Sequence, residues 1–297
     1  MNRVLLKKLL RDVRVFLIVV AILLFAFQLL WARVTYQISH ELPKLLEKTV
    51  PGGAEKFFDD LFAQGPAKIV QTLIGGGTIR LTRGLDTLSV GYVHPLTLII
   101  LSVWAIGRAS AAIAGEIDRG TMELLLAQPI SRSRLIFSHL LVDIVTIPIL
   151  CLAMWLGTWV GTCLVGLKGN PSPILRADPW PFIPALLNVA VLIFATSGST
   201  LFLSAAGRFR SRVLGLAVLL ALVQFLINVI GQLWGPLENL RPLTFYFYYQ
   251  PQPIIVDSAW YEHAQIWGRL AVLFAVGLVG YLLAWWTFCK RDLPAPL

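Results

Sequence analysis

The chain has 297 residues, of which 57% are hydrophobic and 14% are charged, and its mean hydropathy is +0.74. A water-soluble domain carries about 25% charged residues, so this composition excludes a soluble globular protein and predicts an integral membrane protein. The three cysteines show no spacing that indicates a disulfide framework or a metal site. The net charge of +9 does not by itself indicate a nucleic-acid ligand, because in a membrane protein the position of the charges matters more than their sum.

Six segments are long and apolar enough to cross a bilayer as helices, which takes about 20 residues each. The first follows a basic start, as a signal peptide does. Its apolar run is too long for one and no small-residue cleavage site follows, so we interpret it as an anchor. The predicted fold is an all-α integral membrane protein with six transmembrane helices in a single domain, residues 1–297. The predicted spans are residues 15–34, 88–114, 135–165, 182–206, 213–235 and 266–289.

Basic residues predict the orientation of these spans. With the N-terminus placed in the cytoplasm, the short inner connections are rich in lysine and arginine, as cytoplasmic loops are. Both termini are therefore predicted in the cytoplasm of a multi-pass protein of the plasma (inner) membrane. The inner basic residues are Arg3, Lys7, Lys8, Arg11, Arg14, Arg108, Arg119, Arg132, Arg134, Arg208, Arg210, Arg212, Lys290 and Arg291.

The predicted outer connections differ in character. Residues 35–87 carry apolar residues at helical spacing, broken by glycine and proline, and predict short amphipathic helices. These helices either rest on the outer membrane interface or form a lid over a substrate exit. Residues 235–265 are rich in aromatic side chains, which predicts an interfacial belt or a binding surface.

The connection between the second and third spans combines charges with a short apolar run. Gly120 is expected to break the descending helix, and residues 121–128 predict a helix of about two turns. Pro129 is expected to end it, because the residue before a proline is disfavoured in helical conformation. Ser131 is expected to cap the next helix. Three adjacent leucines cannot share one side of so short a helix, so at least one is expected to face away from the bilayer.

This stretch resembles the signature of type-2 ATP-binding-cassette (ABC) permeases. In that family the pattern E-x-x-x-G-T-x-E-x-L-L-x-x-P-I-S-R follows the second span and forms a coupling helix. The ending "FCKRDLP", residues 288–294, is similar to the F-x-R-R-D-L tail of the same permeases, with Lys290 in place of the first arginine. The matching residues of the signature are Glu116, Gly120, Thr121, Glu123, Leu125, Leu126, Pro129, Ile130, Ser131 and Arg132.

The resemblance implies that the chain is the permease subunit of an ABC transporter. A separate cytoplasmic ATPase would bind the ATP and magnesium, a second permease chain, identical or different, would complete the membrane part, and the substrate would be exported. The apolar residues Met122, Leu124, Leu125 and Leu126 would contact the ATPase. Charged residues would orient that contact: Glu116, Asp118, Arg119, Glu123 and Arg132.

Other interpretations of the same residues remain open. The leucines could rest in the membrane interface, and the charges could form a solvated rim without a partner. The chain could be an assembly or scaffold protein of the membrane, or an ion-coupled transporter without an ATPase. An enzyme is not expected, because the sequence has no G-x-x-x-x-G-K-[ST] phosphate loop, no H-E-x-x-H and no G-x-S-x-G. No bound cofactor or metal is expected on this chain.

Polar residues within the spans are the remaining candidates. Asp143 lies four residues after His139, which predicts a pair on one helical face. That pair is either a structural contact or part of a proton- or cation-linked step. Arg108 is expected to extend to the inner interface. The hydroxyl-rich stretch at 196–200 predicts either close packing of helices or a polar substrate route. These candidates are Asp143, His139, Thr196, Ser197, Ser199, Thr200, Gln224 and Asn228.

Overall fold

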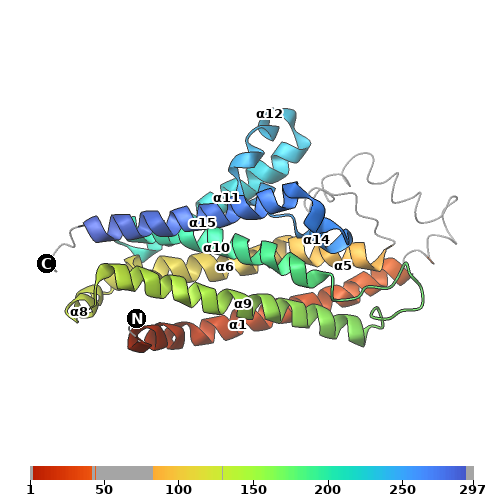
Figure 1. Ribbon diagram of the computed structural model, residues 1–297, viewed down its shortest axis with the longest axis horizontal. Coiled ribbons are helices and arrows are strands. Elements are labelled where there is room, and N and C mark those ends of the chain that lie inside the picture. Colours follow the sequence, from red (N-terminus) through yellow and green to blue (C-terminus); the bar gives the residue numbers. More distant parts are fainter. Residues whose placement is uncertain (1–2, 42–43, 45–82, 129, 292–297) are drawn as a thin grey trace.

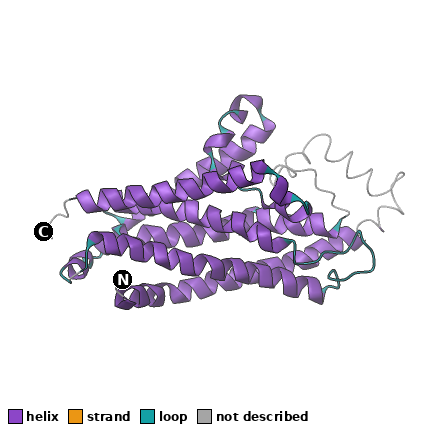
Figure 2. Cartoon of the chain, in the orientation of Figure 1, coloured by secondary structure: helices purple, strands orange, loops and turns teal. Residues whose placement is uncertain are grey.

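The computed structural model describes residues 3–41, 44, 83–128 and 130–291. Helices and their connections account for all of these residues, and no strand occurs among them (Figure 2). Six helical segments are long and apolar enough to cross a membrane. The predicted all-α fold with six spans is therefore confirmed. The amphipathic helices predicted for residues 35–87 lie mostly outside the described residues.

The long helices run side by side along the length of the molecule (Figure 1). The N-terminal one, α1, continues into a short π-helical turn, and the second span consists of α5 and α6. The long helices are α1 (Arg3–Tyr36), α5 (Gly84–Val93) with α6 (Pro95–Ala112), α9 (Arg132–Leu164), α10 (Phe182–Ala206), α11 (Arg210–Leu233) and α15 (Ala264–Lys290).

The second span, predicted over residues 88–114, is broken at Pro95 into α5 and α6. His94 leaves helical conformation, and its ring nitrogen Nδ1 accepts a hydrogen bond from Leu96 N at 3.2 Å. Proline is favourable as the first residue of the helix that follows. The upstream half, α5, is buried along nearly its whole length. It therefore packs inside the bundle.

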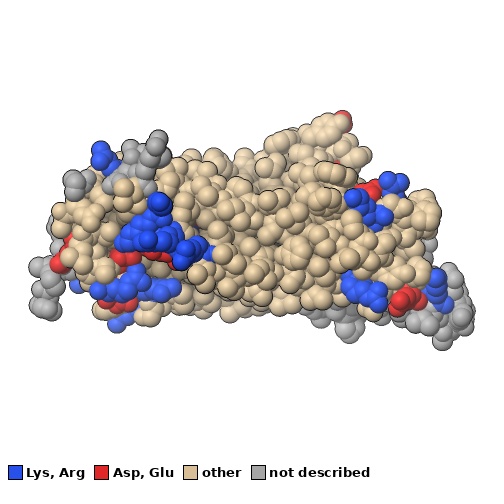
Figure 3. Space-filling model, turned by 90° about the horizontal axis from the view of Figure 1, so that it is seen from below, with Lys and Arg blue, Asp and Glu red and all other residues tan. Residues whose placement is uncertain are grey.

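Successive spans cross the bundle in opposite directions, so their ends gather in two groups. The start of α1 and the end of α15 lie at the same end as the short helix α8 (Met122–Leu126), which we name the α8 end (Figure 1). Side chains from this end form a common apolar cluster that includes Leu5, Ile113, Ile136 and Phe288. On the face shown in Figure 3, lysine and arginine gather near both ends, with a band free of charged side chains between them.

Two pairs of helices pack closely because glycine lets their backbones approach. Gly157 of α9 lies against the backbone of Phe25 in α1. Gly198 of α10 lies against Gly277 and Gly280 of α15. Gly198 belongs to the hydroxyl-rich stretch for which close packing was one of two predictions, and the structure shows that packing between neighbouring spans.

Towards the opposite end, the connection between α11 and α15 forms short helices and turns. They are α12 (Gly235–Glu238), α13 (Phe245–Tyr248) and α14 (Pro251–Val256), with two 3-10 turns, η2 (Arg241–Leu243) and η3 (Trp260–Glu262). The Tyr249 hydroxyl donates to the carbonyl oxygen of Tyr92 at 2.6 Å, and Ile254 and Ile255 are buried in the main core. This segment is therefore part of the folded body.

Candidate functional site

The connection between α6 and α9 is built from two short helices. Ile113 departs from helical geometry with φ −123° and ψ −58° and ends α6. Helix α7 (Ala114–Asp118) follows, and Gly120 has a φ of 69°, a conformation that favours glycine. Helix α8 spans Met122–Leu126, shorter than the predicted 121–128. Ser131 caps α9 as predicted, since its Oγ accepts from Arg134 N at 3.4 Å. Pro129 lies outside the described residues.

Three of the motif's polar side chains bind one another. Arg119 Nη2 lies 2.6 Å from Glu116 Oε1, and the Thr121 hydroxyl donates to the other oxygen of the same carboxylate. Thr121 N also donates to the carbonyl oxygen of Glu116 at 3.0 Å. These bonds fix the turn around Gly120. Glu116 and Arg119 were predicted to orient a partner, and in this structure they pair with each other.

The apolar side chains of α8 divide between the two faces of the helix. Met122 is only 2% exposed and packs in the cluster at the α8 end, which Leu126 also contacts. Met122 was predicted to contact a partner, but in this structure other residues of the same chain cover its side chain. Leu124 is 70% exposed. Glu123 beside it is also exposed, and Leu125 is half-buried.

A serine from the fourth span fastens the break between α6 and α7. The Ser204 Oγ of α10 accepts hydrogen bonds from Ile113 N at 3.2 Å and from Ala114 N at 2.9 Å. The same hydroxyl donates to the carbonyl oxygen of Ser110 at 3.1 Å. Ser204 is fully buried. It therefore satisfies one carbonyl oxygen at the end of α6 and two amides at the start of α7.

The two sequence motifs meet in space at this end. Arg132 Nη1 donates to the carbonyl oxygens of Phe288 at 3.2 Å, Cys289 at 3.4 Å and Arg291 at 2.5 Å. Arg291 in turn donates to the carbonyl oxygens of Ala205 at 2.7 Å and Gly207 at 2.8 Å. Partial burial and the nearby Arg208 lower the pKa of the Arg291 guanidinium, which still keeps its charge at neutral pH. Each arginine thus caps the end of another span.

A contact between α7 and α11 completes the attachment. Asp118 Oδ2 accepts a hydrogen bond from Arg210 N, the first residue of α11, at 3.3 Å. Ser204, Arg132, Arg291 and Asp118 together link the connection to α10, α11 and α15, and we name these four residues the clasp. Sequence reasoning missed the roles of Ser204 and Arg291, because their partners are backbone atoms of distant segments.

A buried ion pair lies inside the bundle, next to the clasp. Arg108 of α6 binds Asp143 of α9, both side chains are at most 2% exposed, and the Tyr281 hydroxyl of α15 donates to the same carboxylate. His139 was predicted to pair with Asp143, but the partners of Asp143 are Arg108 and Tyr281 instead. Arg108 was predicted to extend to the membrane interface. That prediction is wrong, because the guanidinium points into the bundle to reach Asp143.

The other intramembrane candidates do not converge on one site. Thr196 donates to the carbonyl oxygen of Leu192 in its own helix at 2.9 Å, Thr200 is buried and Ser199 half-buried. Gln224 accepts from Phe245 N at 3.0 Å, and Asn228 accepts from Arg241 Nε at 3.5 Å. The amides of α11 therefore hold the connection between α11 and α15. Among the described residues no cluster of side chains could hold a metal ion.

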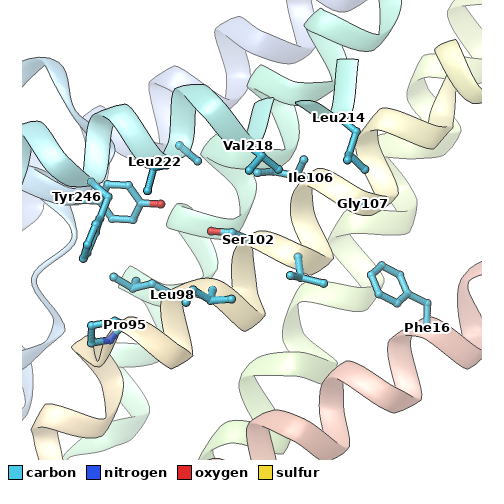
Figure 4. A pocket seen from close by; sticks show the side chains of 14 residues that line it. Phe16, Pro95, Leu98, Ser102, Ile106, Gly107, Leu214, Val218, Leu222 and Tyr246 are labelled. Carbon is cyan, nitrogen blue, oxygen red and sulfur yellow. The ribbon is translucent and has the colours of Figure 1, made fainter. Parts of the chain in front are cut away.

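A groove of about 430 Å³ runs between α6 and α11, with Phe16 of α1 at one end (Figure 4). Leu98, Val218 and Leu222 belong to its walls. Among the described residues that line it, only Ser102 and Tyr246 bring polar side-chain atoms to the groove. The groove therefore suits an aliphatic or aromatic group and offers no counter-charge to an ion.

Replacing Ser204 by alanine should loosen the break between α6 and α7. The amides of Ile113 and Ala114 lose their acceptor, and a lost hydrogen bond of about 1 kcal/mol corresponds to about fivefold faster exchange. Hydrogen–deuterium exchange of peptides covering residues 110–116, in lipid nanodiscs, measures this. Ser197→Ala is the matched control, because that buried hydroxyl on the same helix has no hydrogen-bond partner among the described residues. Equal exchange in both variants would contradict the assignment.

Replacing Asp143 alone by leucine should destabilise the protein strongly. It leaves the Arg108 charge buried without a counter-ion, which costs about 3–5 kcal/mol, whereas replacing both members of such a pair is often near neutral. The double variant Arg108→Leu with Asp143→Leu should therefore melt closer to the wild type than Asp143→Leu does. Thermal unfolding in detergent, followed by size-exclusion chromatography, gives the comparison. A double variant less stable than the single one would refute this account.

Comparison with known proteins places the chain in a family. The sequence profile of the family described as "ABC-2 family transporter protein" matches residues 6–293. The chain is 22% identical over 228 residues to the uncharacterized membrane protein YdbK of Bacillus subtilis (strain 168), covering 72% of this chain and 87% of that protein. No solved structure matches it. Since the profile covers nearly the whole chain, the protein belongs to the ABC-2 transporter family.

Proposed function

We propose that this chain is the permease subunit of an ABC transporter and couples ATP hydrolysis by a separate cytoplasmic ATPase to export of a substrate. The α8 end would face the cytoplasm of a cell whose plasma (inner) membrane holds the protein. ATP and magnesium would bind on the ATPase, and a second permease chain would complete the membrane part. Family membership supports the permease role, and α8 supplies a surface for the ATPase.

The observation that carries the proposal is the exposure of Leu124 at the tip of an otherwise fastened segment. Its side chain is 70% exposed, next to the exposed Glu123. When a partner covers a large exposed apolar side chain, the burial stabilises the complex by about 25 cal/mol per Å² of buried apolar surface. An exposed carboxylate beside it favours a cationic rim on that partner. Together they define a small docking knob on α8.

The clasp would transmit movement of this knob to the spans. When the ATPase closes on ATP, a displacement of α8 would pass directly to α7 and α9, which flank it in the chain. Through Ser204 it would pass to α10, and through Arg132 to the end of α15. Packed helices change between discrete arrangements instead of deforming continuously. A fastened α8 would therefore shift several spans together between inward- and outward-facing states.

An ion-coupled mechanism has less support from the same residues. Asp143 and Arg108 neutralise each other, and Tyr281 donates to the carboxylate. Asp143 therefore offers no unpaired charge to a transported cation, and the groove between α6 and α11 is apolar. The remaining alternative is an assembly protein of the membrane. A permease should co-purify with an ATPase, whereas an assembly protein need not.

Reversing the chemistry of the α8 knob should release the ATPase. The variant Glu123→Arg with Leu124→Arg replaces an acid and an apolar contact by two cations, and an interface of this kind should lose at least about 2 kcal/mol, or roughly 30-fold in affinity. The measurement is affinity capture from the protein's own cells in mild detergent, with mass spectrometry to quantify a co-purified protein that contains a phosphate-loop ATPase motif.

The matched control makes the same two changes at the opposite end of the bundle. Glu238 is exposed on α12, and Leu243 is 76% exposed nearby. Glu238→Arg with Leu243→Arg should retain the ATPase at the wild-type ratio. Retention by the α8 variant as well would refute the docking knob, and absence of any ATPase from the wild-type sample would refute the proposed function itself.

The orientation can be tested with cysteines at the two ends of α9. Cys163 is exposed near the end of α9 that lies away from α8, and Ser133 is exposed at its start. In variants with Cys289→Ser, a membrane-impermeant maleimide should label Cys163 in intact cells. With Cys163→Ser and Ser133→Cys, labelling should require permeabilised cells. The reverse pattern would show that the α8 end faces outward.

A further inference from the structure

The first turns of α1 carry cations that no described residue of the chain neutralises. Lys7, Lys8, Arg11 and Arg14 are exposed, and within the described ranges none of them has a hydrogen bond, ion pair or ring contact. Asp12 is the one acid between Arg3 and Arg14. Several cations elsewhere at the α8 end do have partners: Arg119 has Glu116, Arg132 has backbone carbonyls, and Lys290 lies 4.7 Å from the Trp286 ring centre.

The unpaired cations share one face of the helix. Leu5 is buried and Leu9 packs against the same apolar cluster of α6 and α9, so this side of α1 faces the bundle. At about 100° per residue, the four cations lie within an arc of about 120° centred roughly opposite Leu5 and Leu9. The same arc continues along the helix through Val15, Ile18 and Ile22, which are all exposed. The basic face is thus the continuation of a lipid-facing apolar face.

The change from apolar to basic residues falls at the depth of the lipid headgroups. Residues 15–32 contain no charge, and at 1.5 Å per residue they span about 27 Å, close to the hydrocarbon thickness of a bilayer. Arg14 and Arg33 therefore bound the hydrocarbon layer. Arg33 lies 5.8 Å from the Tyr36 ring centre. At the other boundary Lys7, Lys8, Arg11 and Arg14 have no such partner among the described residues, and they lie at the depth of lipid phosphates.

We propose that this basic face of α1 is a binding site for anionic phospholipids, with their phosphate groups held by Lys7, Lys8, Arg11 and Arg14. Basic side chains near an anionic membrane surface are attracted to it electrostatically. The planar guanidinium of arginine can also bind a phosphate through two parallel hydrogen bonds. The proposal depends neither on the ATPase nor on which side of the membrane the α8 end faces.

The test compares the wild-type protein in nanodiscs of phosphatidylcholine alone and with about 30% phosphatidylglycerol. An amine-reactive acetylating reagent labels lysines, and mass spectrometry quantifies each site. Phosphatidylglycerol should lower labelling of Lys7 and Lys8 at least about threefold relative to Lys290, whose ammonium already lies over a ring. Equal labelling in both nanodiscs would overturn the proposal. Protection in phosphatidylcholine by added inorganic phosphate alone would assign the site to a free anion and would also overturn it.

Lipid retention provides a second measurement. Native mass spectrometry should show fewer bound phosphatidylglycerol molecules on the variant Lys7→Gln, Lys8→Gln, Arg11→Gln and Arg14→Gln than on the wild type. The charge-conserving variant Lys7→Arg, Lys8→Arg, Arg11→Lys and Arg14→Lys should retain them. If the neutral variant keeps the wild-type number of lipids, the basic face does not select anionic lipid. The labelling experiment on the wild type decides the matter even if the neutral variant fails to insert.

Discussion

A helix that ends inside or beside a bilayer leaves backbone N–H and C=O groups without water to bind them, and each unsatisfied group costs several kcal/mol. Much of the arrangement at the α8 end follows from this constraint. Ser204 supplies the missing acceptor where α6 stops, and Arg132 and Arg291 supply donors where α15 and α10 stop. Each cap comes from a different span than the one it completes. Satisfying the helix ends therefore also ties the spans to one another.

The cost of unpaired polar groups away from water also applies to the charges inside the bundle. Arg108, Asp143 and Tyr281 come from three spans, and the pair sits where a lone charge would be very costly. Some polar atoms of this group, including Arg108 Nε and Asp143 Oδ1, have no partner among the described residues. Such a pair adds little net stability compared with apolar packing, but it strongly disfavours arrangements that separate its members. It specifies how α6, α9 and α15 align next to the clasp.

The sequence predicted the features that depend on local composition. Continuous apolar runs gave all six spans, Gly120 marked a break, and Ser131 marked a helix start. The partners of Asp143 could not be predicted from local composition, because spacing along one helix indicates His139. The actual partners, Arg108 and Tyr281, are 35 and 138 residues away in the sequence. The role of Ser204 was equally hidden, since a serine in a span carries no mark of the backbone atoms it will meet. Long-range pairing depends on which helices become neighbours.

Several residues in and around the signature hold the fold together. The sequence pattern alone does not distinguish these residues from those that would contact a partner. Glu116, Arg119 and Thr121 are occupied in fixing the turn at Gly120, Met122 is covered by the bundle, and Arg132 caps α15. Among the residues of α8, this leaves Glu123, Leu124 and the half-buried Leu125 to meet another protein. Most side chains in this connection therefore hold α8 in place by contacts within the chain. Only two or three of them form the surface that would meet a partner.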